Sequence, residues 1–340
     1  MENYKKTLCS LRKNFALFAV TFLFIALIFT SCDNQPKKVD KQPETISQQP
    51  AVNKQISPNF NADSAYYFVQ KQCDFGPRVT NSDEAKKCGD WIVGELKKYT
   101  DNVIEQKTTI TNFDDRKLNI RNIIAEINPK AKKRIMLCSH WDSRPYADKD
   151  NVDPTKPILG ANDGASGVGV LLEIARILKS NPVDIGIDLI LFDAEDLGKN
   201  EYRHSYCLGS QYWSTNLHHP GYTAEFGVLL DMVGGVNATF AWEANSEEYA
   251  KPYLEKVWST AQNLGYSKQF IYFQYGGIED DHFYVNKNAR IPTIDIIHLE
   301  NTPNTFPEYH HTHRDNMSVI DRGTLKAVGQ TLLEVIYSEK

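Results

Sequence analysis

The chain has 340 residues, of which 24% are charged and 41% are hydrophobic, and its formal net charge at pH 7 is -5. These are ordinary globular values, and the length leaves room for one large domain or two small ones. The negative net charge argues against a nucleic-acid-binding protein.

The first 32 residues carry the pattern of a secretory signal. Lysines and an arginine precede an apolar stretch from about Phe15 to Ile28, and Thr30-Ser31-Cys32 follows it. The cysteine at the cut predicts a bacterial lipoprotein in which Cys32 is lipidated and becomes the new N-terminus. We therefore expect residues 1–31 to be a lipoprotein signal peptide. The mature protein would be exported and membrane-anchored, facing the periplasm or the cell surface. The alternative is an uncleaved membrane helix, for which the apolar stretch is short.

Residues 32–60 predict a flexible tether. They are rich in Gln, Pro, Lys, Asn and Ser and contain almost no large apolar residue, so they cannot bury enough surface to order themselves. From residue 61 to residue 340 the pattern changes to helices and strands, with no internal repeat and no sign of a second domain. We expect this segment to be a single folded domain.

The folded segment alternates helical and strand-like stretches. Ser82 to Tyr99 predicts a helix with Ser82 as its N-cap, and Ser166 to Leu178 predicts a second, amphipathic helix. Apolar runs of strand length occur at residues 118–127, 135–138, 187–192, 227–233 and 293–297. Strands that are apolar throughout and alternate with helices indicate a sheet covered on both faces. The sequence therefore predicts an α/β fold, a three-layer α/β/α sandwich around a mostly parallel mixed sheet.

The cysteines do not predict a metal-binding finger. Beyond the signal segment and Cys32, the chain has Cys73, Cys88, Cys138 and Cys207. In an oxidising compartment four cysteines allow three pairings, and the sequence does not choose among them. Cys138 falls in a buried-looking strand, where an inert thiol is expected.

Acids and histidines follow the predicted strands. In such a sheet, functional side chains gather at the carboxyl ends of the strands. One strand runs into His140 and Asp142, the next into Glu195-Asp196, and a third ends at Asp231. Two further polar segments are Gly160 to Gly167, which contains Asp163 and precedes the second helix, and His310-His311-Thr312-His313 near the C-terminus.

Each of these residues alone could have a purely structural role, as a helix cap or a solvated loop residue. As a set they are costly to gather in one crevice unless a cation compensates the carboxylates. Carboxylates and imidazoles are suitable ligands for zinc. No Gly-rich phosphate loop follows the first strand, and no GxSxG elbow is present, so neither a nucleotide nor a serine nucleophile is expected.

In order along the chain, these residues resemble the co-catalytic zinc aminopeptidase superfamily, and within it the glutaminyl-peptide cyclotransferase (glutaminyl cyclase) branch. The matching pattern runs from about Phe75 to Asn316 and comprises His140-x-Asp142, Gly160-Ala-x-Asp163, Glu195-Asp196, Asp231 and His311-Thr312. The cyclase branch is favoured by Ile278-Glu279-Asp280-Asp281-His282, by Phe306-Pro307-Glu308, by Gly209-Ser210, and by the compact chain without an inserted domain.

The resemblance implies one zinc ion held by Asp163, Asp196 and His311, with a fourth position left for water or substrate. His310 is the fallback for His311. Glu195 would be the general base and acid, Asp281 the acid that hydrogen-bonds the reacting centre, and Asp231 a member of the same hydrogen-bond network.

This chain departs from the animal cyclases in its pocket. His310 stands where they have a tryptophan, and Asp196 stands where a glutamate is common. Near the place of another pocket tryptophan, Tyr202 is the available aromatic residue.

The implied activity is zinc-dependent cyclisation of the N-terminal glutamine of peptides or proteins to pyroglutamate, with release of ammonia. The alternative is a zinc aminopeptidase that hydrolyses N-terminal residues, in which His140 and Asp231 hold a second zinc ion. A third interpretation is a metal-free surface lipoprotein that binds peptides or glycans. The implied partners are peptides or proteins with N-terminal glutamine and, through Cys32, a membrane; nucleic acid is not expected.

Overall fold

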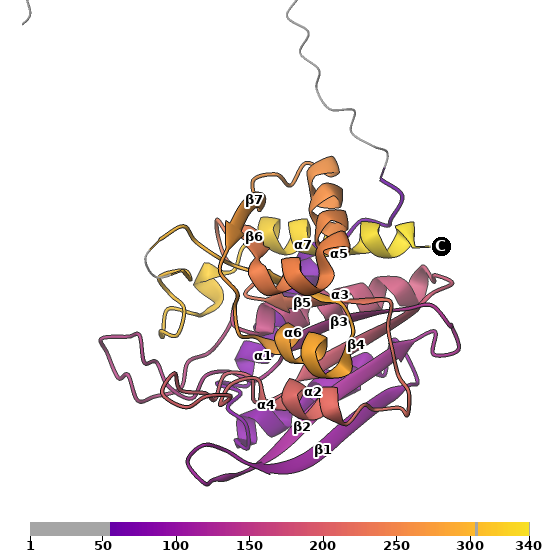
Figure 1. Cartoon of the computed structure of the whole chain (residues 1–340). Helices are drawn as coiled ribbons and strands as arrows, with labels where there is room; N and C mark the ends of the chain where they lie inside the picture. Colours follow the sequence, from indigo (N-terminus) through magenta and orange to yellow (C-terminus); the bar gives the residue numbers. More distant parts are fainter. Residues whose placement is uncertain (1–54, 303–304, 340) are drawn as a thin grey trace, which may run out of the picture. The chain divides into compact units, whose positions relative to one another are not determined.

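A computed structural model describes residues 55–302 and 305–339 (Figure 1). The predicted signal peptide, Cys32 and most of the predicted tether lie outside these residues. The part of the chain that is described contains no helix that is both long and apolar enough to cross a bilayer.

The folded unit is an α/β domain in which helices flank a central sheet. The elements in chain order are α1 (Ala62–Asp74), α2 (Asp83–Leu96), β1 (Val103–Thr111), β2 (Lys117–Ile127), β3 (Arg134–His140), α3 (Ala165–Ser180), β4 (Gly186–Phe192), α4 (Leu208–Thr215), β5 (Phe226–Asp231), β6 (Phe240–Glu243), α5 (Ala244–Asn263), β7 (Phe270–Tyr275), α6 (Asp281–Tyr284), the π-helix η1 (Val285–Ala289), β8 (Thr293–Ile297), the 3-10 helix η2 (Met317–Val319) and α7 (Arg322–Ser338).

The main sheet has six strands in the order β1-β2-β4-β3-β5-β8. The neighbours β4, β3, β5 and β8 run parallel, whereas β1 pairs with β2 and β2 with β4 in antiparallel fashion. The predicted mostly parallel mixed sheet is therefore confirmed. The strands β6 and β7 form a separate two-stranded parallel sheet.

Both faces of the main sheet are covered, which explains why its central strands are largely apolar. In β3, Ile135 and Leu137 join the core formed with α1, α2, α3, α5 and α7, whereas Met136 and Cys138 join the core on the opposite face. That second core includes Trp213 of α4 and residues of η1. Because side chains alternate between faces along a strand, a strand between two cores is apolar at most positions, and the buried Asp188 of β4 is paired with Arg134.

The folded domain begins earlier than the predicted boundary at residue 61. The Glu334 carboxylate on α7 accepts hydrogen bonds from the backbone N–H groups of Ile56 and Ser57, at 2.9 and 3.0 Å. Phe60 is buried, and its backbone N–H donates to the Gln330 side chain at 2.9 Å. Residues 55–60, which were expected to belong to the tether, thus pack against the C-terminal helix.

The predicted N-cap of the first sequence-predicted helix is confirmed. The Ser82 side chain accepts a hydrogen bond from the backbone N–H of Ala85, and α2 runs from Asp83 to Leu96. Within the described residues, Cys73, Cys88, Cys138 and Cys207 are all buried free thiols, so no pairing among them is present.

A buried histidine gives the fold a defined response to acid. The His218 side chain is fully buried, and its Nδ1 accepts a hydrogen bond from Trp213 Nε1 at 3.1 Å. Its Nε2 faces the Glu126 carboxylate at 3.9 Å, and His219 and Arg134 contribute repulsive charge. Burial is the main cause that lowers the pKa of His218 to about 4 from an ordinary value of 6.5.

We expect the free energy of unfolding to fall as the pH drops from about 6.5 to about 4. In this window the unfolded chain binds a proton at His218 that the folded chain does not, so acid favours unfolding; below about pH 4 the loss is complete. Urea unfolding at several pH values would show a weaker dependence for His218→Gln than for the wild type. His219→Gln, at the half-exposed neighbour, is the matched control, and equal slopes for all three proteins would contradict the prediction.

Candidate active site

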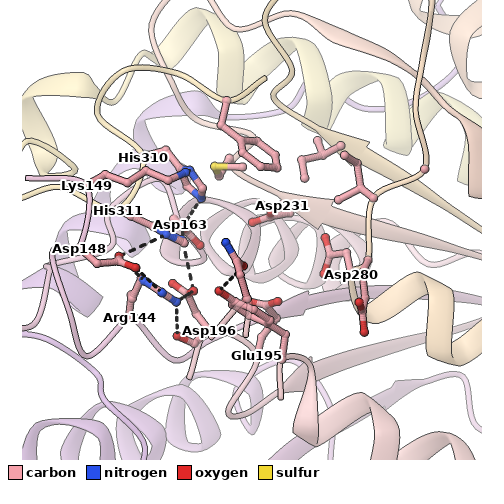
Figure 2. A pocket seen from close by; sticks show the side chains of 18 residues that line it. Arg144, Asp148, Lys149, Asp163, Glu195, Asp196, Asp231, Asp280, His310 and His311 are labelled. Atoms are coloured by element: carbon pink, nitrogen blue, oxygen red, sulfur yellow. Dashed lines mark hydrogen bonds and ion pairs between the residues drawn. The ribbon is translucent and has the colours of Figure 1, made fainter. Parts of the chain in front are cut away.

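A cavity of about 340 Å³ opens at the carboxyl ends of the parallel strands. Figure 2 shows acids and histidines gathered around it. The residues that line it and bear on its chemistry are Arg144, Asp148, Lys149, Asp163, Glu195, Asp196, Tyr206, Asp231, Asp280, His310 and His311. Each of the predicted site residues except Asp281 is among them.

The three predicted metal ligands come from separate segments, and His311 contacts both of the acids. Asp163 precedes α3, Asp196 follows β4, and His311 lies in the loop before α7. His311 Nε2 is 3.2 Å from Asp196 Oδ1 and 3.7 Å from Asp163 Oδ2. All three residues are at least nine-tenths buried.

This donor set fits a zinc ion. Nitrogen and oxygen ligands lie about 2.0–2.1 Å from zinc, so two ligands of one tetrahedral ion are roughly 3.4 Å apart. The two distances from His311 Nε2 bracket that value. Asp196 Oδ2 is also buried and has no hydrogen-bond partner among the described residues, as expected for an oxygen that serves as a metal ligand. Two carboxylates and one imidazole leave a coordination position open for a substrate atom.

Two residues that the sequence did not single out support this cluster. Arg144 donates to both oxygens of Asp148 at 2.7 Å and to Asp196 Oδ1 at 2.9 Å. Asp148 Oδ1 in turn faces His311 Nδ1 at 3.6 Å. A carboxylate beside Nδ1 favours the proton there and leaves the lone pair on Nε2, which is the arrangement a metal ligand needs.

His310 occupies a different environment from His311 although their rings stack at 3.6 Å. Lys149 Nζ lies 2.6 Å from His310 Nδ1, and in its ammonium form it can only donate a hydrogen bond there. Nδ1 must therefore carry the lone pair, so the neutral ring carries its proton on Nε2, which is 3.7 Å from Asp163 Oδ2. A protonated Nε2 is unsuited to metal binding, which favours His311 over His310 as the ligand.

His140 contacts three carboxylates, one of which is the predicted metal ligand Asp163. Its Nε2 is 3.0 Å from Asp163 Oδ1 and 3.2 Å from Asp231 Oδ1, and its Nδ1 is 3.4 Å from Asp142 Oδ1. Burial lowers the pKa of His140, but the hydrogen bonds to the three carboxylates outweigh it and raise that pKa well above its usual range. Burial and the Asp163 charge raise the pKa of Asp231 to about 8 against the lowering effect of His140.

Glu195 is the acid best placed to move a proton in the cavity. Its backbone N–H donates to Asp142 Oδ1 at 3.0 Å, which fixes the loop after β4. Burial is the main cause that raises the pKa of its carboxyl well above the usual range. The neighbouring Asp196, Asp280 and Asp281 add to the rise, against the lowering effect of His140. A carboxyl group whose pKa is raised holds a proton more readily than an ordinary glutamate, which suits a group that accepts and returns a proton.

Of the two adjacent acids at the start of α6, Asp280 reaches the cavity and Asp281 does not. Asp280 lines the cavity, and its side chain also accepts from the Asp281 backbone N–H to cap α6. Asp281, which the resemblance singles out, is fully buried and does not line the cavity, although its charge acts on Glu195. The pattern Glu-Asp-Asp-His does not reveal which of two consecutive side chains faces inward, because that depends on the turn that enters the helix.

The backbone around Asp163 leaves no space for larger residues. A Cβ on Gly164 would lie 2.4 Å from the His140 carbonyl oxygen and 2.5 Å from His140 Nε2. Glycine at this position therefore lets the segment before α3 approach the end of β3, so that Asp163 can contact His140.

A buried arginine ties the same two loops together from the side of the core. The Arg78 guanidinium is fully buried and donates to the carbonyl oxygens of Trp141 at 3.1 Å, Leu159 at 2.6 Å and Gly160 at 2.8 Å. Trp141 follows β3, and the other two residues belong to the loop that leads to α3. Arg78 does not line the cavity, so its role is to hold the loops that carry the site.

Comparisons with known proteins match this arrangement. The model of a family described as Peptidase family M28 matches residues 122–336, a span that includes the whole metal cluster. Glutaminyl-peptide cyclotransferase from Bos taurus is 28% identical over 261 residues, which cover 68% of this chain and 69% of that protein.

Two solved structures are more similar. The glutaminyl cyclase of Tannerella forsythia is 49% identical with a TM-score of 0.82, covering 83% of this chain and 100% of that chain. A structure described as a Zn-dependent exopeptidase from Parabacteroides distasonis is 51% identical with a TM-score of 0.81, with the same coverage.

Proposed function

Because the chain belongs to peptidase family M28, we propose that its site cyclises the N-terminal glutamine of peptides or proteins to pyroglutamate and releases ammonia. The observation that carries this proposal is the meeting of a three-ligand metal cluster and the proton-holding Glu195 in one small cavity. Its volume of about 340 Å³ suits a single terminal residue rather than a long stretch of peptide. The similarity to glutaminyl cyclases supports the same conclusion.

The site residues divide into metal ligands and a proton carrier. We propose that Asp163, Asp196 and His311 hold one zinc ion, which when bound would supply Lewis acidity at the substrate's γ-carbonyl oxygen. Glu195 takes a proton from the α-ammonium group, so the freed amine attacks the γ-carbon of the same residue. The new C–N bond closes the ring, and the amide C–N bond breaks. Glu195 then delivers its proton to the departing nitrogen, which leaves as ammonia, and takes up the second proton of the ring nitrogen, so that the pyroglutamate ring is neutral.

A second candidate function is supported by one observation. His140, Asp163 and Asp231 offer three donor atoms close enough to share a metal ion, as do Asp163, His310 and His311. Two adjacent metal ions suit hydrolysis, because water must be activated, whereas intramolecular attack by an amine needs no activated water. An aminopeptidase that uses both clusters is therefore the alternative.

The reaction product separates the two functions. The zinc-loaded protein is incubated with a peptide that begins with glutamine, and the products are read by mass spectrometry. We expect the loss of one ammonia from an otherwise intact peptide. The same peptide with an acetylated N-terminus is the control and should not react, because its amine is blocked. Free glutamine together with a shortened peptide would instead establish an aminopeptidase.

We also propose that the protein is an exported lipoprotein anchored through Cys32. The cationic start, the apolar stretch and the small residues before Cys32 support this proposal. The test is whether the mature protein partitions with membranes and carries a lipid on its first residue.

A further inference from the structure

One buried thiol contacts the carboxylate that moves the proton. Cys207 Sγ lies 3.2 Å from Glu195 Oε1, and Cys207 is fully buried. Over residues 55–302 and 305–339, no other side chain donates a hydrogen bond to the Glu195 carboxylate. Nothing in the resemblance to the cyclases assigns a role to this cysteine.

Backbone hydrogen bonds and close packing fix the position of the Cys207 thiol beside Glu195. The Cys207 N–H donates to the Glu195 carbonyl oxygen at 2.8 Å, and the Leu208 N–H donates to the Ala194 carbonyl oxygen at 3.0 Å. Ala194 and Cys207 both adopt left-handed backbone conformations, with φ of 58° and 57°. A Cβ on Gly209 would lie 2.2 Å from the Asp193 carbonyl oxygen, so the start of α4 is packed directly against the loop after β4.

We propose that Cys207 is a positioning residue for Glu195, its S–H group holding Oε1 so that the carboxylate stays turned toward the cavity. A glutamate side chain has three rotatable bonds, and a carboxylate that rotates freely is aligned with the substrate only part of the time. The inference rests on the role given to Glu195 in the proposed function.

The chemistry of the pair supports this direction of donation. In the ionised form that takes the proton, the Glu195 carboxylate only accepts hydrogen bonds, whereas a thiol carries one proton to donate. Burial, followed by the charges of Glu195, Asp281 and Asp280, raises the pKa of Cys207 well above its usual range. Cys207 therefore remains a protonated thiol, which acts as a donor and not as a nucleophile.

The test compares two substitutions at one position. We expect Cys207→Ala to lower kcat about tenfold with KM and zinc content unchanged, because a hydrogen bond to a charged group is lost while the ligands stay in place. Cys207→Ser, which keeps a donor, should remain within about threefold of the wild type. Cys138→Ala is the matched control: Cys138 is also fully buried, but the hydrogen bond that its thiol makes is to the Val228 carbonyl oxygen, at 3.7 Å. Its kcat should equal that of the wild type.

A spectroscopic measurement tests the contact without turnover. The S–H stretching band of Cys207, identified in the infrared by its loss in Cys207→Ala, should shift when Glu195→Gln replaces the charged acceptor by a neutral one. An unshifted band, an unchanged kcat in Cys207→Ala, or a Cys207→Ser variant as slow as Cys207→Ala would each overturn the proposal. Thermal unfolding of every variant identifies a loss that is due to instability.

Failure of the proposed function gives a different result. If the wild type releases free glutamine instead of cyclising the peptide, the cyclase assignment is wrong. The same variants assayed on hydrolysis then test the positioning role, because Glu195 is the base in either reaction. A wild-type protein that turns over neither way would overturn both proposals.

Discussion

Replacing Glu195 by Gln is expected to lower kcat for glutamine cyclisation by roughly 10³-fold while leaving zinc bound, since general acid–base catalysis contributes about 10² to 10⁴. The amide has nearly the same shape as the carboxylate but cannot take the proton from the α-ammonium group. The proposed metal ligands Asp163, Asp196 and His311 are unchanged. Product formation followed by mass spectrometry and zinc content by elemental analysis check the two parts of the expectation.

The separation of rate from metal content makes this result informative. If Glu195→Gln lost its zinc, Glu195 would have to be counted among the ligands. If it kept a wild-type rate, another acid would be the proton carrier. Asp280 would then be the first candidate, because it lines the cavity and its charge acts on Glu195.

Replacing His311 by Ala is expected to remove both the zinc and the activity. The lost Lewis acidity corresponds to several kcal/mol and hence to roughly 10³-fold or more in rate. His311 Nε2 is the atom that joins Asp163 to Asp196, and without it the two carboxylates share no nitrogen donor at that point. Zinc content after dialysis and turnover of a glutamine peptide measure the effect.

His310→Ala is the matched comparison, since it removes a neighbouring imidazole that also faces Asp163. We expect it to retain zinc, because the Lys149 ammonium group already occupies the lone pair on His310 Nδ1 and leaves the proton on Nε2. The opposite outcome, with zinc lost in His310→Ala and kept in His311→Ala, would show that the ligand assignment is reversed.

The central strands that the sequence predicted are buried on both faces. The strands β3, β4 and β5 are largely apolar because a core lies on either side of them, and such runs are readily recognised. The edge strand β1 reads VIEQKTTIT, and none of its residues is buried, so apolar patterning gave no signal for it. The short β6 and β7 lie outside the main sheet and were likewise not predicted.

The convergence of the site was predictable for a topological reason. Residues after parallel strands meet at one edge of a sheet, so the ends of β3, β4 and β5 bring His140, Glu195, Asp196 and Asp231 together. The contacts that tune these groups were not predictable from pattern. The contacts of Arg144 and Cys207 with the site depend on loop conformations. Asp280 and Asp281 are both aspartates, and only the direction of the side chain decides that Asp280 lines the cavity.

Arg78 shows how a residue outside the cavity would be scored in a mutational screen. Its guanidinium is buried against three backbone carbonyl oxygens and joins the loop after β3 to the loop before α3. Lysine cannot satisfy three acceptors that lie in the directions of a planar fork, so even this conservative change would release both loops.

A library of variants ranked by activity alone would therefore place Arg78 beside Glu195 and His311, although it touches no substrate. Such a ranking does not separate residues that hold the site in place from residues that take part in the reaction. Abundance of folded protein, scored in parallel with turnover, separates the two groups of positions, because Arg78 variants would fail in both scores and Glu195 variants in only one.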